Sequence, residues 1–253
     1  MSDAIALIEE LAANAVPPLL WQELDGWRAR YAGGVTRRAN SVLAPREGGQ
    51  LGLDERIALA EAFYRRRGAL CRFQICPASR PAGLDAALEA RGYTSGPATL
   101  VQTAPLAALL PLAAGRAGVA ESFDEAWLAA YAEGEGETSA AKIASRREML
   151  GRIGPPAGFA ALREGGRIAA VALGVVERGH LGIFSVATAP AWRGRGLARA
   201  ALGDLAAWAG EHGAHTAYLQ VFSANAPALR LYERLGFGTL YQYWYREKTV
   251  WAG

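Results

Sequence analysis

The chain has 253 residues, of which 51% are hydrophobic and 20% charged, and its formal net charge is +3. This length gives room for one large or two small domains, and we favour two. The basic residues are spread along the chain, which argues against nucleic acid as a partner. No apolar run approaches the roughly 18 residues of a membrane span, and acids stand where a secretory signal needs basic residues. We therefore expect a cytoplasmic protein without a membrane partner.

The cysteine content is low and carries no metal signal. Cys71 and Cys76 lie five residues apart in a strand-like run. Residues at this spacing point to opposite faces of a strand. We therefore expect neither a metal pair nor a local disulfide, in agreement with a reducing cytosol.

Hydrophobic periodicity predicts alternating helices and strands in the first half of the chain. Residues 1–22 place Ile5, Ile8 and Leu11 at helical spacing before a Pro-Pro break, so an amphipathic helix is expected there. Gly33-Gly34 is expected to turn a hairpin. The other expected elements are strands over 24–31, 35–43, 70–76 and 99–102, a helix over 54–67 capped by Asp54, and a helix over 84–91 closed by Gly92.

The second half begins after an apolar stretch over 106–115, which Pro111 interrupts. Ser122 can cap the first helix, and Gly165-Gly166 can turn a hairpin. The expected elements are strands over 119–120, 159–163, 168–177, 181–188, 217–222 and 240–245 and helices over 123–133, 140–150 and from 197 onward.

The two halves repeat the same order of elements. Gly92-Tyr93 lies 144 residues before Gly236-Phe237, and the strand, helix and glycine-aromatic pattern recurs at that offset. Such a period predicts a tandem duplication. We expect an N-terminal domain over 1–112 and a C-terminal domain over 113–253.

The stretch from Phe184 to Arg199, FSVATAPAWRGRGLAR, combines a strand, a glycine turn and the start of a helix. The first N–H groups of a helix have no internal partner and lie at the positive end of its dipole, so glycines there let an anion approach. A dinucleotide fingerprint would need a glycine at Arg199, and a P-loop would need a Gly-Lys-Ser/Thr ending. Both are absent, so the stretch predicts an anion site of another kind.

Two motifs resemble those of the GNAT N-acetyltransferase superfamily. RGRGLA, from Arg193 to Ala198, is similar to the family's acetyl-CoA loop, Gln/Arg-x-x-Gly-x-Gly/Ala. NAPALRLYERLGF, from Asn225 to Phe237, resembles its second signature. The resemblance implies a mixed α/β fold, the GNAT acyl-CoA N-acyltransferase fold, complete in the C-terminal domain and partial in the N-terminal one. Thr188 departs from the family, which usually has Val there.

The resemblance also implies roles for individual residues. The strand backbone near Thr188 would contact pantetheine, the glycine loop would bind the pyrophosphate, and Tyr232 would protonate the departing thiolate. The cofactor-binding residues implied in this way are Val186, Ala187, Thr188, Arg193, Gly194, Arg195, Gly196, Leu197, Ala198, Arg199 and Asn225.

These residues also have structural interpretations. The loop could be an ordinary turn with solvated arginines, and Asn225 could cap a helix. Tyr232 lies on an apolar helical stripe and could belong to the core. At the corresponding position the first half has Leu88, so it lacks this tyrosine.

No general base stands out in the sequence. Glu177, His180 or an ordered water could serve. His212 and His215 are expected to be surface or capping histidines rather than metal ligands.

Two further groups could contribute to an acceptor site. The acidic loop could attract a cationic amine or simply be solvated, and the tyrosines that share one face of the last strand could wall the acceptor site or pack. The loop residues are Glu133, Glu135 and Glu137, and the tyrosines are Tyr241, Tyr243 and Tyr245.

Together these observations predict an acetyl-CoA-dependent N-acetyltransferase that passes the acetyl group to a primary amine by direct attack in a ternary complex. The acceptor could be a small molecule or a peptide, and the oligomeric state is not readable. The alternative is an acyl-CoA-binding sensor or scaffold without turnover.

Overall fold

The computed structural model describes residues 2–251, which form two compact units. Unit 1 comprises 2–100, 222–224 and 241–251, and unit 2 comprises 101–221 and 225–240. The chain therefore contributes most of its last strand, from Tyr241 onward, to unit 1. The domain boundary expected between residues 112 and 113 stays a prediction.

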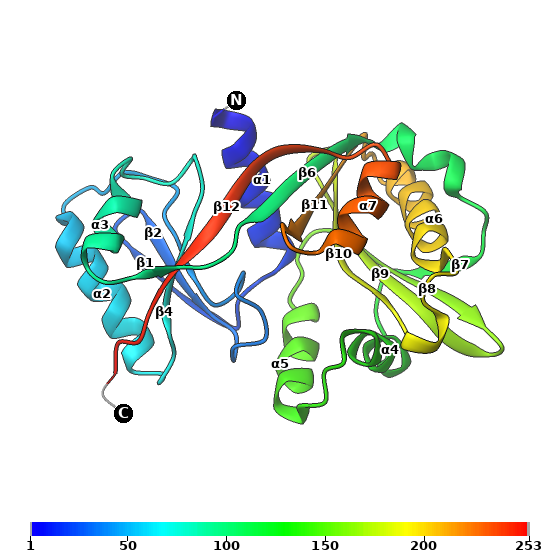
Figure 1. The fold of residues 1–253 in the computed structure, drawn as a ribbon, viewed down its shortest axis with the longest axis horizontal. Helices are drawn as coiled ribbons and strands as arrows, with labels where there is room; N and C mark the ends of the chain where they lie inside the picture. The colour runs from blue at the N-terminus through cyan, green and yellow to red at the C-terminus, as the bar shows by residue number, and fades with distance from the viewer. Residues whose placement is uncertain (1, 252–253) are drawn as a thin grey trace. The chain divides into compact units, whose positions relative to one another are not determined.

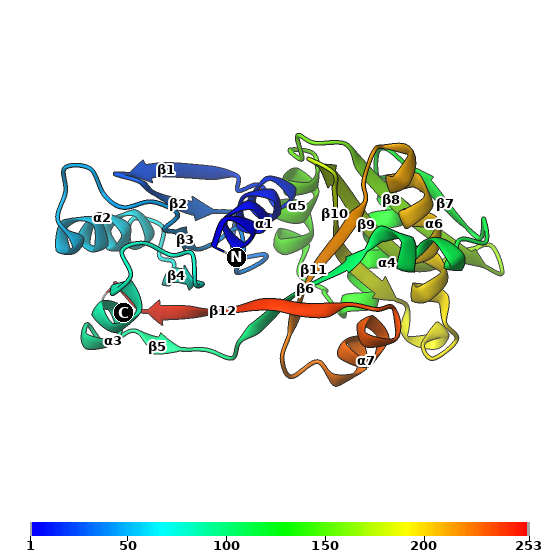
Figure 2. The same cartoon turned by 90° about the horizontal axis from the view of Figure 1, so that it is seen from above.

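Unit 1 contains a sheet in which the strands follow the order β1-β2-β3-β4-β12, with β5 beside β12. Figure 1 labels β1, β2, β4 and β12 of this sheet. Figure 2 shows β1 to β4 side by side. The elements are α1 (Ser2–Ala15), β1 (Leu20–Leu24), β2 (Trp27–Tyr31), β3 (Val42–Leu43), α2 (Leu53–Arg65), β4 (Cys71–Ile75), α3 (Leu84–Ala90), β5 (Thr94–Ser95) and β12 (Gly238–Lys248).

The expected opening helix is confirmed as α1, but it ends at Ala15, and Leu20 and Trp21 belong to β1. Two other expectations for unit 1 were wrong. The hairpin turns at Asp25-Gly26, where both residues have positive φ (47° and 90°), and not at Gly33-Gly34. Helix α2 has Gly52, not Asp54, as its N-cap residue.

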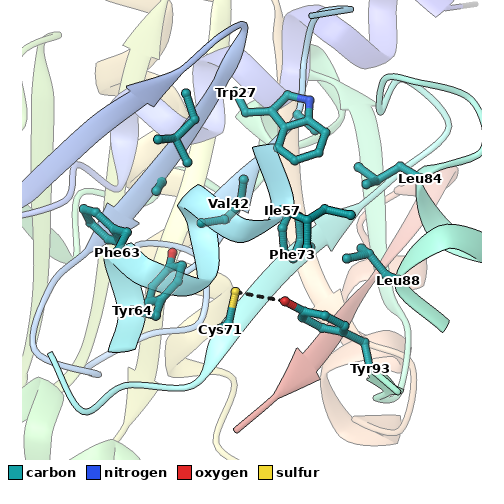
Figure 3. Close-up of a cluster of buried hydrophobic side chains, with 14 of the residues drawn as sticks. Trp27, Val42, Ile57, Phe63, Tyr64, Cys71, Phe73, Leu84, Leu88 and Tyr93 are labelled. Carbon is teal, nitrogen blue, oxygen red and sulfur yellow. Dashed lines mark hydrogen bonds between the residues drawn. The ribbon is translucent and has the colours of Figure 1, made fainter. Parts of the chain in front are cut away.

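The two faces of the unit 1 sheet differ in chemistry. Residues of β4 alternate, so Cys71, Phe73 and Ile75 enter an apolar cluster with α2 and α3, while Gln74 points to the other face. Figure 3 shows Phe73 and Tyr93 in this cluster, with the Tyr93 hydroxyl within 3.3 Å of the Cys71 sulfur. One face is thus an aromatic core, and the other is polar.

Unit 2 contains a sheet in the order β6-β11-β10-β9-β8-β7. The hairpin at Gly165-Gly166 and the helix from Ala140 are confirmed. The elements are β6 (Thr99–Pro105), the short 3₁₀ turns η1 (Leu106–Ala108) and η2 (Leu110–Leu112), β7 (Ala117–Ala120), α4 (Glu125–Glu135), α5 (Ala140–Leu150), β8 (Ala157–Glu164), β9 (Arg167–Glu177), β10 (His180–Thr188), η3 (Pro190–Trp192), α6 (Leu197–Glu211), β11 (Thr216–Phe222) and α7 (Ala226–Arg234).

Helices α6 and α4 pack on opposite faces of the unit 2 sheet (Figure 1). Trp208 of α6 lies against Gly158, where an added Cβ would come within 2.7 Å of its ring. Trp127 of α4 packs edge-on against the next residue, Phe159. Successive residues of a strand face opposite sides, so the two helices enclose the sheet. The expected cap of α4 was wrong: Asp124, not Ser122, accepts the bond from the Trp127 N–H.

Between residues 2 and 251, the structure has no helix with the length and apolar character needed to cross a bilayer.

Candidate active site

The parallel pairing of β10 with β11 stops halfway along β10. The two strands are in register from His180 with Thr216 to Ile183 with Leu219, although β10 continues to Thr188. On its other side β10 stays paired with β9 and contains a bulge at Ser185, whose φ is +48°. A bulge re-aims the backbone of one strand. The segment Val186–Thr188 therefore lies outside the β10–β11 ladder, where an extended ligand could bond to its backbone.

The glycine loop leads directly into α6. Gly194 and Gly196 have φ of +76° and +75°, a region that side chains with a Cβ rarely adopt. An added Cβ at either position would meet nothing within 4 Å, so the loop is open around both glycines. Gly196 is the N-cap residue of α6 and supplies no side-chain acceptor.

The first N–H groups of α6 are consequently available to a ligand. Within residues 2–251, no side chain accepts a hydrogen bond from the N–H of Leu197, Ala198 or Arg199. Arg195 and Arg199 are exposed, and the Arg195 guanidinium lies 4.8 Å from the centre of the Trp192 ring. Free N–H groups, the helix dipole and two cations suit a phosphate group. The chemistry of this donor set therefore fits the pyrophosphate of an acyl-CoA.

Arg193 is exposed, and its side chain bonds the loop to two backbone carbonyls. Its Nε donates to the carbonyl of Thr188 (3.3 Å), and its Nη2 donates to the carbonyl of Gly134 (2.8 Å). Gly134 itself must be a glycine, because an added Cβ would lie 2.7 Å from the Cβ of Ala187. The side chain of Arg193 thus ties the end of β10 to the last turn of α4, a connection that the sequence did not reveal.

Asn225 and Tyr232 occupy the two ends of α7. The Oδ1 of Asn225 accepts from the Ala228 N–H at 3.2 Å, which confirms the capping role, and Asn225 is exposed. Tyr232 is 8% exposed, and its ring meets Phe237 edge-on at 5.8 Å. The ring is therefore packed as the apolar stripe predicts, and its catalytic role stays a prediction.

The residues considered as a general base lie at the other end of β10. His180 begins the strand, and at about 3.3 Å per residue it is roughly 26 Å along the strand from Thr188. Its Nδ1 is 2.7 Å from the Arg178 carbonyl, and its ring faces that of His215. Glu177 is further back, at the end of β9. Neither Glu177 nor His180 can reach a reaction at the Val186–Thr188 segment.

The expected acidic loop is only partly a loop, because Glu133 and Glu135 belong to the last turn of α4 and only Glu137 follows it. Glu137 accepts from the Ser139 N–H (2.9 Å) and pairs with Lys142 (3.1 Å), and these contacts, the backbone bond first, hold the pKa of Glu137 below its ordinary value. Glu133 lies 3.5 Å from Arg167. These contacts favour the solvated-loop interpretation over attraction of a cationic amine.

Among residues 2–251, the structure has no group of three or more His, Cys, Asp or Glu side chains that could hold a metal ion.

Comparison with known proteins gives the chain a family. A family model described as "Probable histone acetyltransferase Rv0428c C-terminal" matches residues 2–246. The chain is 28% identical over 252 residues to the "Uncharacterized N-acetyltransferase YobR" of Bacillus subtilis (strain 168), covering 97% of this chain and 99% of that protein.

Solved structures show the same fold. A "GCN5-related N-acetyltransferase from Kribbella flavida" has a TM-score of 0.68 at 14% identity and covers 96% of this chain and 95% of its own. A "Tandem GNAT protein from the clavulanic acid biosynthesis pathway" has a TM-score of 0.60 at 16% identity, covering 83% and 77%. The chain therefore belongs to this acetyltransferase family and is an enzyme with the GNAT fold.

Proposed function

We propose that the protein transfers the acetyl group of acetyl-CoA to a primary amine by direct attack in a ternary complex. This proposal rests on the N–H groups at the start of α6, which have no side-chain acceptor in the described part of the chain. They lie close in sequence to the part of β10 that leaves the β10–β11 ladder. An anion-binding helix start and a strand backbone outside the β10–β11 ladder are complementary to a diphosphate followed by an amide-containing arm.

Each segment would have one task. The N–H groups from Gly194 to Arg199 would bind the pyrophosphate, with Arg195 and Arg199 adding positive charge. The backbone of Val186, Ala187 and Thr188 would bond to the pantetheine amides, and Asn225 would border the same arm. Bound acetyl-CoA would supply an acetyl group activated as a thioester.

The chain's own groups would then assist the transfer. A strand N–H near Val186 would donate to the oxygen on which negative charge develops. Tyr232 would hold the proton that the departing sulfur takes up, since a phenol is protonated at neutral pH. We assign this chemistry to residues 113–253 and treat 1–112 as a copy without it. The cytoplasmic location expected from the sequence stays a prediction.

The first experiment is calorimetric titration of acetyl-CoA, and of CoA without the acetyl group, into the purified chain. We expect one site per chain with micromolar affinity, about 8 kcal/mol of binding free energy. A screen of primary amines should then release free CoA. If neither acetyl-CoA nor CoA binds, the proposal is contradicted.

A matched pair of variants isolates the loop. Gly196→Glu places a carboxylate among the N–H groups of α6, and we expect at least about a 100-fold loss of acetyl-CoA affinity. Gly213→Glu, at the other end of the same helix, introduces the same residue at a similar φ (+81°), also with nothing within 4 Å. Equal losses in both variants would show that strain, not the anion site, is responsible.

A further inference from the structure

A buried polar network occupies the face of the unit 1 sheet that carries Gln74. Glu9 of α1 is 9% exposed; its Oε1 accepts from the Tyr241 hydroxyl and its Oε2 from the Gln74 amide, each at 2.6 Å. Gln74 in turn accepts from the Arg30 guanidinium at 3.4 Å. The network therefore ends on a carboxylate whose direct partners are both neutral.

Glu9 lacks a direct countercharge. Within residues 2–251 it forms no salt bridge, and the nearest cation in the network, Arg30, is bonded to Ser41 and Gln74 instead. Burial raises the pKa of Glu9, although Tyr241, Arg30 and Gln74 oppose this shift. A carboxylate removed from water is costly unless a cation pairs with it. Each oxygen also retains a second acceptor site.

A cavity of about 560 Å³ lies against this carboxylate. Glu9 and Gln74 form part of its wall, and Ala13, Leu43 and Ala44 supply apolar surface. The volume is within the range of pockets that hold small organic ligands. The wall thus combines one buried acid with apolar surface, the complement of a cation on a short carbon chain.

The charges nearer the solvent do not neutralise Glu9. Glu23 is paired with Arg28 at 2.8 Å, so these two lining residues cancel each other. Glu10 and Arg46 also line the cavity, and both are exposed to solvent. Exposed charges are screened by water and salt, whereas the buried one is not. The dominant electrostatic feature of the cavity is therefore Glu9.

We propose that this cavity binds a small alkylammonium ligand, with its ammonium group on the Glu9 carboxylate and its carbon chain against Ala13, Leu43 and Ala44. The site uses residues of unit 1 alone, and the proposal does not rest on acetyl-CoA binding. It gives the N-terminal unit a ligand of its own.

The test is calorimetric titration of the full chain with hexylamine at neutral pH, where the amine is protonated, and with hexan-1-ol and hexanoate. We expect one hexylamine site per chain and at least tenfold weaker binding of the alcohol and the acid. Equal binding of the alcohol would mean that Glu9 is neutral and would overturn the proposal. So would the absence of hexylamine binding at millimolar concentration.

Three variants assign the site. Glu9→Gln should weaken hexylamine binding at least tenfold, whereas Glu10→Gln, the adjacent exposed acid of the same helix, should stay within twofold. Ala13→Leu keeps the carboxylate network and fills the cavity one helical turn from Glu9, so it should also weaken hexylamine binding about tenfold. This variant tests the site even if Glu9→Gln does not fold. Unchanged affinity in Ala13→Leu would overturn the proposal.

Two further measurements locate the ligand. Gly196→Glu should retain hexylamine binding, and its loss there would place the amine at the acetyl-transfer site instead. Cys76 lines the cavity and is partly exposed, whereas Cys71 is fully buried. Saturating hexylamine should slow alkylation of Cys76 by iodoacetamide at least threefold, measured by peptide mass spectrometry; an unchanged rate would contradict this location.

Discussion

Helices α2 and α6 begin at matching places in the two halves of the chain, but the N–H groups of the loops that precede them have different partners. Leu53 and Leu197 open the helices 144 residues apart, each after a glycine. Within residues 2–251, no side chain accepts a hydrogen bond from the N–H groups of 194 and 195 in the loop before α6. Before α2 the carboxylate of Asp25 accepts from the N–H groups of 49–51 at 2.8–3.0 Å.

The charges around the two helix starts differ in the same sense. Asp54 and Glu55 stand in the first turn of α2, and the Glu55 carboxylate accepts from the Gly52 N–H at 2.9 Å. The matching positions in α6 are Ala198 and Arg199. An incoming phosphate would meet repulsion at α2 and attraction at α6. We infer from this comparison that Asp25 and Glu55 take up N–H groups of the first half that a ligand anion would otherwise use.

The largest expected effect concerns Tyr232, whose counterpart at the same offset is the fully buried Leu88. Tyr232→Phe removes the hydroxyl and keeps the ring, so the packing against Phe237 should survive. We expect kcat to fall about 100-fold, the scale of general acid catalysis, with acetyl-CoA affinity within twofold. Rates of CoA release and calorimetry measure the two quantities.

Tyr243→Phe, another buried tyrosine, is the control for this substitution and should leave kcat unchanged. If the kcat of Tyr232→Phe stays within twofold of the parent value, Tyr232 is not the general acid.

A tenfold effect is expected for Arg193→Ala. The corresponding position of the first loop has a glycine, Gly48 or Gly49. Loss of the bonds to Thr188 and Gly134 should loosen the loop and weaken acetyl-CoA binding about tenfold. Because the side chain positions backbone, we expect the same loss at low and high salt.

Arg195→Ala provides the contrast, because an exposed charge is screened and its contribution should shrink as salt rises. Calorimetry at two salt concentrations separates the variants. A strongly salt-dependent loss for Arg193→Ala would mean that it acts through its charge and not through the two carbonyls.

The smallest effect is expected for Asp25→Asn, which weakens the internal anion of the first loop. Hydrogen bonds, that from the Leu51 N–H first, hold the pKa of Asp25 below its ordinary value. A lowered pKa means that this contribution is complete above the unfolded-state value, about 3.9, and is lost as the pH falls through the folded value. Amide exchange of residues 49–51 should be faster in the variant near neutral pH, and the ratio to the parent should approach one in strong acid.

The amides of 197–199 serve as the internal reference for that measurement and should not change. Asp54→Asn, an exposed acid near the same loop that pairs with Arg91, should leave the amides of 49–51 unaffected. Equal acceleration in both acid-to-amide variants would remove the special role of Asp25.

The sequence was sufficient for features that depend on local pattern. The loop from Arg193 to Ala198, the helix after it and the hairpin at Gly165-Gly166 have periodicities and turn residues that decide their structure. The hairpin at Asp25-Gly26 also has a local signal, since Asp-Gly favours such turns, and the prediction of a turn at Gly33-Gly34 missed it.

Other features depend on residues that meet only after folding. Nothing in the sequence links Asp25 to an N–H group 26 residues later, or Arg193 to Gly134. The bulge at Ser185 arises where β10 departs from β11, and no glycine or other turn residue at that position predicts it. Periodicity reports which face of an element is apolar, but not which polar atoms converge across elements.

The assignment of the last strand to unit 1 has a consequence for biosynthesis. Residues 244–248 of β12 pair with β4, and Arg246 bonds to Asp85 and Glu89. The ribosome synthesises the first 100 residues, which include β4, Asp85 and Glu89, long before it reaches residues 244–248 of β12. Unit 1 must therefore wait, with one edge of β4 unpaired, until the end of β12 emerges, although its sequence is almost entirely the first to be translated.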